Sequence, residues 1–139
     1  MAGGGRSVFA RIVGGEIPCQ KVFENEHVLA FLDIRPLADG HTLVIPKQEV
    51  AHLDQLAPDA AAELGRALGL VARKVVQATG AAGYNVLLNN GRVAGQEVEH
   101  VHFHIIPRRE GDGLGYRWRP QERTAAELEA LAARIRAVP

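Results

Sequence analysis

The stretch His100-Val101-His102-Phe103-His104-Ile105-Ile106 places three histidines at every second position of an apolar segment. Side chains alternate across a β-strand with a period of two. We therefore predict a strand over residues 99–106, with the histidines on one face and Val101, Phe103 and Ile105 packed into the core from the other. Imidazole changes charge near neutral pH, so such a row can move protons, attack an electrophile or hold a metal.

The composition indicates a single domain of ordinary globular character. The chain has 139 residues, which is enough to bury a core without a staple. Its 16 basic and 16 acidic residues leave no basic excess, so we expect no nucleic acid partner. Cys19 is the only cysteine and excludes an intrachain disulfide. No apolar run reaches the ~20 residues that span a membrane, and residues 1–6 lack the apolar stretch of a signal peptide. We expect a cytoplasmic protein with no membrane partner.

The remaining patterns predict an α+β fold with a five-stranded, mostly antiparallel sheet, a long central helix and a C-terminal helix. The long helix covers residues 58–79, where Leu64, Leu68, Val71 and Val75 form one apolar stripe. Thr124 and Glu127 form a capping box that begins the final helix. The other expected elements are a short helix or turn within 9–17 and strands at 21–23, 28–32, 42–45 (stopped by Pro46) and 84–89.

The Gly-rich residues 1–6 are expected to be disordered, and residues 7–139 to form one domain with a tail and helix over about 108–139. This leaves the histidine row as the feature most informative about function.

Four interpretations of the histidine row compete. Three surface histidines in alternation by chance would be unusual. Two histidines two residues apart can ligate one metal ion, but the third lies too far along a straight strand, and regular alternation puts Glu97 on the opposite face. Nucleophilic catalysis needs a neutral imidazole that its neighbours orient, and clustered histidines lower one another's pKa. A nucleotide-binding module without turnover could use the same groups.

The segment Gln96 to Ile106 resembles the His-φ-His-φ-His-φ-φ signature of the histidine triad (HIT) superfamily, in which φ is an apolar residue. Three further blocks resemble its Hint-like branch. They are Phe9-Ala10-Arg11-Ile12-Val13-Gly14-Gly15-Glu16-Ile17-Pro18, Phe31-Leu32-Asp33-Ile34-Arg35-Pro36 and His41-Thr42-Leu43-Val44-Ile45-Pro46-Lys47, with Asn89 and Gly95-Gln96 matching the loop before the triad. The resemblance covers residues 7 to 109, about three-quarters of the chain.

The resemblance implies a HIT-like fold and chemistry at the α-phosphorus of a nucleotide. The middle histidine of the family is the nucleophile, so His102 would form a transient nucleotidyl-histidine that water resolves to a nucleoside monophosphate. His41 and His100 would orient and hydrogen-bond, and His104 would contact the phosphate and protonate the leaving group. Because the last histidine is retained as His104, hydrolysis is favoured over transfer to a sugar phosphate.

The resemblance also implies a set of nucleotide-binding residues. Asp33 matches the carboxylate that accepts hydrogen bonds from the ribose hydroxyls, which suits an acceptor-only group. The expected set is Asp33, Ile34, Phe9, Ile12, Ile17, Phe31, Asn89, Gly95, Gln96, Glu97, His102 and His104, of which the apolar members would line the base pocket. Asn89 and Gln96 carry amide donors suited to phosphate oxygens, and Gly95 lets the backbone approach closely.

Two positions depart from the family pattern. Many Hint-like enzymes carry serine where this chain has Glu97, and an ionised carboxylate cannot donate a hydrogen bond to phosphate, which leaves the leaving group open. Some bacterial members bind zinc through an amino-terminal Cys-x-x-Cys, and Ser7 and Ala10 occupy those positions here. We predict no zinc there and no cofactor, and we expect Cys19 to be an inert apolar residue.

The leading hypothesis is a purine nucleotide hydrolase of the phosphoramidase type. Its substrates would be derivatives of AMP, with GMP derivatives as a second option, and the protein would form a homodimer as the family usually does. A dinucleoside polyphosphate hydrolase and a non-catalytic nucleotide-binding module are the alternatives. The tail residues Arg117, Trp118 and Arg119 are expected to reach toward the other subunit's site.

Overall fold

The computed structural model describes residues 6–115 and 118–139 of the chain. Its helices, strands and 3₁₀ turns follow one another as α1 (Val8–Val13), β1 (Lys21–Glu24), β2 (Val28–Leu32), β3 (Thr42–Pro46), η1 (Leu53–Gln55), α2 (Pro58–Thr79), β4 (Gly83–Leu88), η2 (Arg92–Ala94), β5 (Phe103–Arg108) and α3 (Ala125–Arg136). Of the residues 1–6 expected to be disordered, 1–5 lie outside the described residues, and Arg6 forms an ion pair with Glu16.

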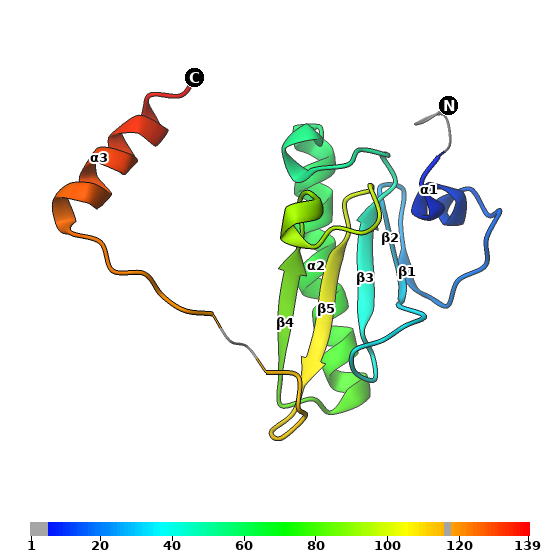
Figure 1. The fold of residues 1–139 in the computed structure, drawn as a ribbon. Helices are drawn as coiled ribbons and strands as arrows, with labels where there is room; N and C mark the ends of the chain where they lie inside the picture. The colour runs from blue at the N-terminus through cyan, green and yellow to red at the C-terminus, as the bar shows by residue number, and fades with distance from the viewer. Residues whose placement is uncertain (1–5, 116–117) are drawn as a thin grey trace.

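The five strands form one sheet in the order β1-β2-β3-β5-β4, and every pairing is antiparallel. Helix α2 crosses behind the sheet, and α1 lies on the front beside β1 and β2 (Figure 1). The α+β architecture with an antiparallel sheet is therefore confirmed. It leaves β4 at one edge and brings β5 to an inner position between β3 and β4.

The alternation of side chains along the strands divides the core into two layers. Val28, Ala30 and Val44 point toward α2 and pack with its buried residues. Leu29 and Phe31 point the other way and form a second cluster with Phe9 of α1, together with Leu43 and Ile45. Strands β2 and β3 are apolar on both faces because each face is covered.

Helix α2 has the predicted bounds. Pro58 occupies the first helical turn, where its missing N–H costs nothing, and Gly80 ends the helix with a left-handed backbone angle φ of 67°. Leu64, Val71 and Val75 of the predicted stripe are buried, and Leu68 is partly buried against them. Fully burying one such aliphatic side chain contributes about 1.5–3 kcal/mol, so this stripe holds the helix on the sheet.

The predicted strand at 99–106 is wrong in its bounds, because β5 begins at Phe103 and runs to Arg108. His100 and His102 precede the strand, yet the two faces are as expected. Val101 and Ile105 are buried in the α2 layer with Phe103 packed against it, and His104 faces the other side between Leu43 and Leu87. The imidazoles are not a solvent-exposed row, since His100 is 0% and His102 6% exposed.

Two prolines lie inside strands, and one of them, Pro46, was expected to stop its strand. Pro46 is the last residue of β3, and Pro107 lies in β5 opposite Tyr84. Pairing between β3 and β5 stops at Ile105, so Pro107 lies beyond the part of β5 that needs hydrogen-bond donors on both sides. Proline is tolerated in a sheet at a position where no backbone N–H has to donate to a neighbouring strand.

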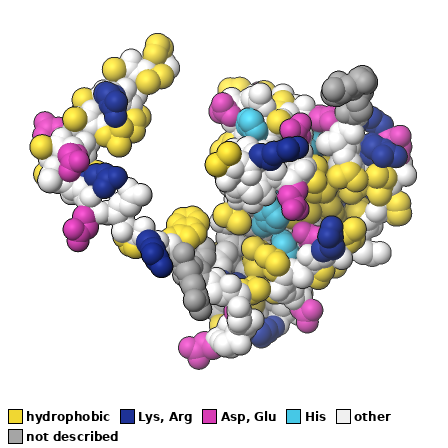
Figure 2. All heavy atoms as spheres, in the orientation of Figure 1, with side chains coloured by type: hydrophobic (Ala, Val, Ile, Leu, Met, Phe, Trp, Pro, Cys, Tyr) yellow, Lys and Arg dark blue, Asp and Glu magenta, His cyan; other side chains and the backbone are white. Residues whose placement is uncertain are grey.

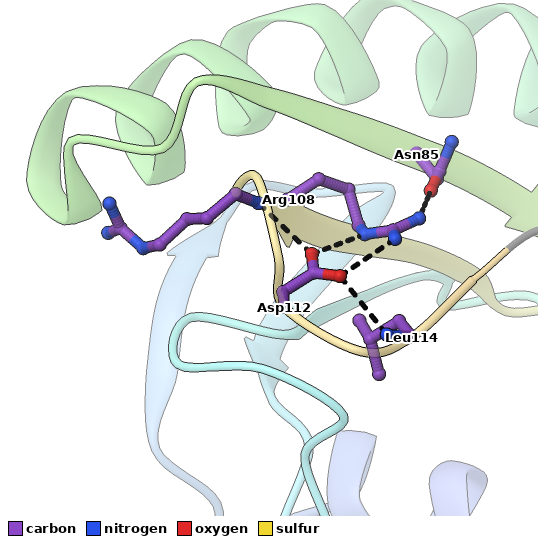
Figure 3. A network of polar contacts seen from close by, with 5 residues as sticks. Asn85, Arg108, Asp112 and Leu114 are labelled. Carbon is purple, nitrogen blue, oxygen red and sulfur yellow. Dashed lines mark hydrogen bonds and ion pairs between the residues drawn. The ribbon is translucent and has the colours of Figure 1, made fainter.

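A polar turn after β5 directs the chain away from the sheet. The guanidinium of Arg108 donates two hydrogen bonds to Asp112 and one to Asn85, and Asp112 also accepts from the backbone of Arg109 and Leu114 (Figure 3). Helix α3 stands apart from the body (Figure 1). Its predicted capping box is present, but its apolar residues Leu128, Leu131 and Ile135 are exposed.

Across the described ranges, no helix combines the length and apolarity needed to cross a bilayer.

Candidate active site

A cavity of about 450 Å³ opens on the face of the sheet opposite α2, between α1 and the segment that carries the histidines. Histidine side chains are visible in the middle of this face, beside a broad group of hydrophobic side chains on the α1 side (Figure 2). The volume lies in the range typical of small-molecule sites. The expected site residues that line it are Phe9, Ile12, Ile17, Phe31, Asp33, Ile34, Asn89, Gly95, Glu97, His102 and His104.

The tautomer of His102 follows from its hydrogen bond to the backbone. Its Nδ1 lies 2.7 Å from the carbonyl oxygen of His100. A carbonyl oxygen only accepts, so Nδ1 carries the proton and Nε2 of the neutral ring is a bare lone pair. The ring packs edge-on against Phe9, with the centroids 4.9 Å apart. His102 therefore presents a fixed, unprotonated nitrogen at the cavity.

The ring of His104 is set by a second histidine. The backbone N–H of Leu37 donates to Nδ1 of His41 at 3.0 Å, so the proton of neutral His41 is on Nε2. That Nε2–H donates to Nδ1 of His104 at 2.9 Å. The Asp33 carboxylate lies 3.6 Å from Nε2 of His41. His104 consequently carries its own proton on Nε2. Its ring centroid lies 5.0 Å from that of His102, which places a donor beside the bare nitrogen.

Burial keeps these imidazoles neutral. It lowers the pKa values of His41, His100 and His102 below the ordinary 6.5. Burial, reinforced by the neighbouring His102 and His41, lowers the pKa of His104 to about 4. A neutral imidazole is the form that can act as a nucleophile, so the cluster is in its reactive protonation state at neutral pH.

The opposite wall of the cavity is apolar and ends at one carboxylate. Phe9 and Phe31 pack edge to face with centroids 5.6 Å apart. Ile34 stands at the rim with 91% of its surface exposed, so it is available to cover a bound planar group. Asp33 accepts the backbone N–H of Arg35 through one carboxylate oxygen, at 2.8 Å. A planar apolar group and a pair of hydroxyls would match this wall.

Three expected site residues lie behind the cavity. His41 and His100 are buried and do not line it, but His41 contacts the lining residue His104 and His100 contacts the lining residue His102. Gln96 accepts the N–H of Gly91 and donates to the carbonyl of Ala51, so its amide holds the loop together. The positive φ of 100° at Gly95 requires glycine there, and Nδ2 of Asn89 lies 3.5 Å from the Gly95 carbonyl oxygen.

The structure adds residues to the expected set and explains the position of one that was already in it. Glu97, which the resemblance placed in the nucleotide-binding set although regular alternation would put it on the opposite face, lines the cavity because the chain before Phe103 is not a regular strand. Cys19 lines it as well, along with Val8, Pro18, Leu32, Arg35, Leu43 and Val98. Ser7 was named only as a position that lacks a zinc-binding cysteine, and its hydroxyl oxygen lies 2.9 Å from Nδ1 of His100. No spacing in the sequence connects positions 7 and 100.

Metal ligands are offered by one cluster among the described residues, Asp33, His41 and His104, whose ligand atoms lie within 4.8 Å of one another. The two histidines already share a hydrogen bond between Nε2 of His41 and Nδ1 of His104, so the group is a hydrogen-bonded cluster. Ser7 and Ala10 provide no thiolates for the zinc site of some bacterial HIT proteins. The serine hydroxyl instead accepts from the backbone N–H of Ala10 and contacts His100.

Comparison with known proteins matches the HIT domain model over residues 14–111. The chain is 47% identical over 129 residues to an adenosine 5'-monophosphoramidase of Schizosaccharomyces pombe, covering 92% of this chain and 94% of that protein. It is 43% identical over 107 residues to the adenylylsulfatase HINT3 of Arabidopsis thaliana, covering 77% and 54%. A HIT family structure from Bacillus subtilis superimposes with a TM-score of 0.92 at 38% identity, covering 97% and 98%. With its histidine cluster and antiparallel sheet, the chain belongs to the HIT domain family.

Proposed function

We propose that the protein hydrolyses a purine nucleotide derivative at its α-phosphorus and releases the nucleoside monophosphate. The observation that carries this proposal is the pair of ring nitrogens at the cavity, with a bare Nε2 on His102 beside an Nε2–H on His104. The relative from S. pombe is named an adenosine 5'-monophosphoramidase, which supports an amine as leaving group. The apolar wall would hold the base, and Asp33 would accept from the ribose.

The reaction divides into two displacements at phosphorus. In the first, the lone pair of His102 Nε2 forms a bond to phosphorus as the bond to the leaving atom breaks with its electron pair. His102 then carries positive charge, which the His100 carbonyl stabilises at Nδ1–H. In the second, a water oxygen attacks phosphorus, the N–P bond breaks and its electrons return to His102. The water releases one proton to solvent, and the nucleoside monophosphate leaves.

The structure suggests a narrower role for His104 than leaving-group protonation. Its Nδ1 already accepts the proton of His41, so loss of the Nε2 proton would leave an anionic imidazolate. We therefore assign to His104 a hydrogen bond from Nε2–H to the phosphoryl oxygen or the departing atom. An amine leaving group takes its one proton from solvent, which balances the proton that the water releases in the second step. Sulfate or carboxylate leaving groups need no proton.

Glu97 bears on the choice of leaving group. Its carboxylate lines the same cavity as His102 and His104, and it is close enough to favour a positive charge on His102. A leaving group with several negative charges would be repelled there, while an amine would not. This supports a phosphoramidate substrate over a dinucleoside polyphosphate, which remains the alternative within the same class.

A substrate panel tests the proposed function. Hydrolysis of an adenosine or guanosine phosphoramidate would be compared with that of adenylyl sulfate and diadenosine polyphosphates, using the wild type and His102→Ala. We expect the phosphoramidate to be the best substrate and the variant to be inactive while still binding AMP. Nucleotide binding without turnover of any substrate would instead favour the non-catalytic module.

We also propose that the protein forms a homodimer. Strand β4 is an edge of the sheet, and its Tyr84 and Val86 are 47% and 46% exposed. An apolar edge strand with unpaired backbone groups is a template for pairing with a second copy. Of the tail residues expected to reach the partner's site, Arg117 lies outside the described residues, and Trp118 and Arg119 follow the gap. Light scattering tests whether the protein is a dimer. Kinetics of a chain ending at residue 114 test whether the tail contributes to the partner's site.

A further inference from the structure

Ser7 joins the start of α1 to the first histidine of the triad. Its hydroxyl oxygen accepts the backbone N–H of Ala10 at 2.9 Å, which caps the helix, and lies 2.9 Å from Nδ1 of His100. Its own backbone N–H donates to the carboxylate of Glu49 at 2.7 Å. The hydroxyl, the backbone N–H and the backbone carbonyl of Ser7 are therefore all hydrogen-bonded, and two of the partners, Glu49 and His100, are distant in sequence.

The direction of the Ser7–His100 hydrogen bond follows from the other side of the ring. Nε2 of His100 lies 2.9 Å from the carbonyl oxygen of Pro46, which can only accept. Nε2 therefore carries the proton, and Nδ1 of the neutral ring is an acceptor. The hydroxyl of Ser7 must donate to it. The tautomer of His100 is thus set by two contacts: the Ser7 hydroxyl donates to Nδ1, and the Pro46 carbonyl accepts from Nε2–H.

His100 in turn holds the group that orients His102. Its carbonyl oxygen accepts from Nδ1 of His102 at 2.7 Å, and that bond leaves Nε2 bare. Residues 100–102 lie outside β5, so no strand pairing fixes this carbonyl. The segment is held by the two hydrogen bonds of the His100 ring and by the backbone bonds from His100 to Val98 and from Val101 to Val50. Loss of a bond to the ring would therefore let the backbone shift at this carbonyl and would misalign the reacting nitrogen.

We propose that Ser7 is a positioning residue for nucleotidyl transfer, which locks the tautomer and place of His100 and thereby aims His102 at the phosphorus. The inference rests on the proposed function for its kinetic consequences but not for the contact itself. Ser7 also begins the helix that carries Phe9, which packs on His100 and His102 with ring centroids 6.2 and 4.9 Å away. Ser7 thus helps to position both Phe9 in the apolar wall and the nucleophile His102.

Three substitutions at this position separate the hydroxyl from the helix cap. Ser7→Thr keeps both the cap and the donor. Ser7→Val has nearly the shape of threonine but offers neither. Ser7→Asp caps a helix well, yet an ionised carboxylate cannot donate to Nδ1 of His100. Thr124→Val is the matched control, because it removes the same kind of cap from α3, far from the cavity.

The first readout is kinetic, with the phosphoramidate as substrate. We expect Ser7→Thr and Thr124→Val to keep the wild-type kcat. Ser7→Val and Ser7→Asp should lose about tenfold to a hundredfold in kcat with little change in KM, because a misplaced nucleophile loses its attack geometry. In Ser7→Asp the acid limb of the plot of kcat against pH should also move to higher pH. The new carboxylate would raise the pKa of His100, as Glu49 already does, whereas the neighbouring His102 lowers it.

The second readout is nitrogen NMR of the His100 ring in the protein without substrate. Wild type and Ser7→Thr should show the Nε2–H tautomer, and Ser7→Asp should show protonation at Nδ1. Unchanged tautomers in Ser7→Asp, or equal kcat in Ser7→Thr, Ser7→Val and Ser7→Asp, would overturn the inference. If the wild type turns over none of the nucleotides, the proposed function fails, and the spectra still decide whether Ser7 sets the His100 tautomer.

Discussion

His41 donates a hydrogen bond from Nε2 to Nδ1 of His104 at 2.9 Å, and this bond fixes the proton of His104 on its other nitrogen. The site therefore contains a fixed hydrogen-bond donor, Nε2–H of His104, and a fixed lone pair on Nε2 of His102. Both rings are uncharged at neutral pH. A buried site of this kind stabilises charge that appears only during the reaction, because its donors need not reorganise.

The role of His104 as a hydrogen-bond donor predicts a difference between two substitutions. His104→Ala should lower kcat by about 10²–10³, the usual loss for one donor to a developing oxyanion. His104→Gln keeps an N–H of similar reach and should retain at least tenfold more activity than the alanine variant. Steady-state kinetics on an amine-releasing substrate checks this. Equal losses in both variants would indicate that His104 must deliver a proton.

Asp33 should discriminate by the sugar of the nucleotide. Asp33→Asn replaces a carboxylate that can accept from both ribose hydroxyls with a group that can accept through one atom only. We expect kcat/KM for a ribonucleotide substrate to fall about tenfold, as for loss of a charged hydrogen bond. The 2'-deoxy substrate serves as the control and should be affected less. An equal fall for both would mean that Asp33 acts on the histidine cluster rather than on the ribose.

Glu97 should set the preference for leaving groups. Glu97→Gln removes a negative charge from the cavity wall with little change of shape. The ratio of kcat/KM for adenylyl sulfate to that for the phosphoramidate should rise roughly threefold to tenfold, because a partly screened repulsion of ~1 kcal/mol is lost. In the wild type, added salt should narrow the difference in kcat/KM between adenylyl sulfate and the phosphoramidate. A ratio that does not change would exclude an electrostatic role for this carboxylate.

The buried histidines should make the fold less stable in mild acid. A histidine whose pKa is depressed in the folded state gains a proton on unfolding, so the free energy of unfolding falls as pH falls below the unfolded value. For His104 the window runs from 6.5 down to about 4, and its share is up to about 3 kcal/mol. Urea unfolding between pH 7.5 and 4 measures this. His104→Asn should flatten the slope, and an unchanged slope would contradict the assignment.

The sequence predicts the helices and strands well where periodicity and end signals agree. Helix α2 is stated residue for residue by Pro58, its apolar stripe and Gly80, and β2 by a run of strand formers. The bounds of β5 were misjudged because Val101 lies in the α2 layer without belonging to a strand. Alternating burial continues past the end of the hydrogen-bonded ladder, and sequence shows only the burial.

The site is predictable only in part, for a physical reason. The histidines and Asp33 carry their chemistry in the residue type, and the resemblance to the HIT superfamily relates them to one another. The contact between Ser7 and His100 depends on how α1 docks, and a serine before a helix indicates only a cap. The amide of Gln96 looked suited to phosphate but is used by its own loop, which no local pattern shows.

The most direct measurement is the capture of a nucleotide on His102. The protein would be mixed with an adenosine phosphoramidate, quenched on the millisecond scale at alkaline pH, where a phosphorus–nitrogen bond to imidazole survives, and analysed by peptide mass spectrometry. We predict an adenylyl group on His102 that forms and decays within the turnover time and is absent in His102→Ala. Turnover by the wild type with no adenylylated histidine, or an adenylyl group on another residue, would contradict the mechanism.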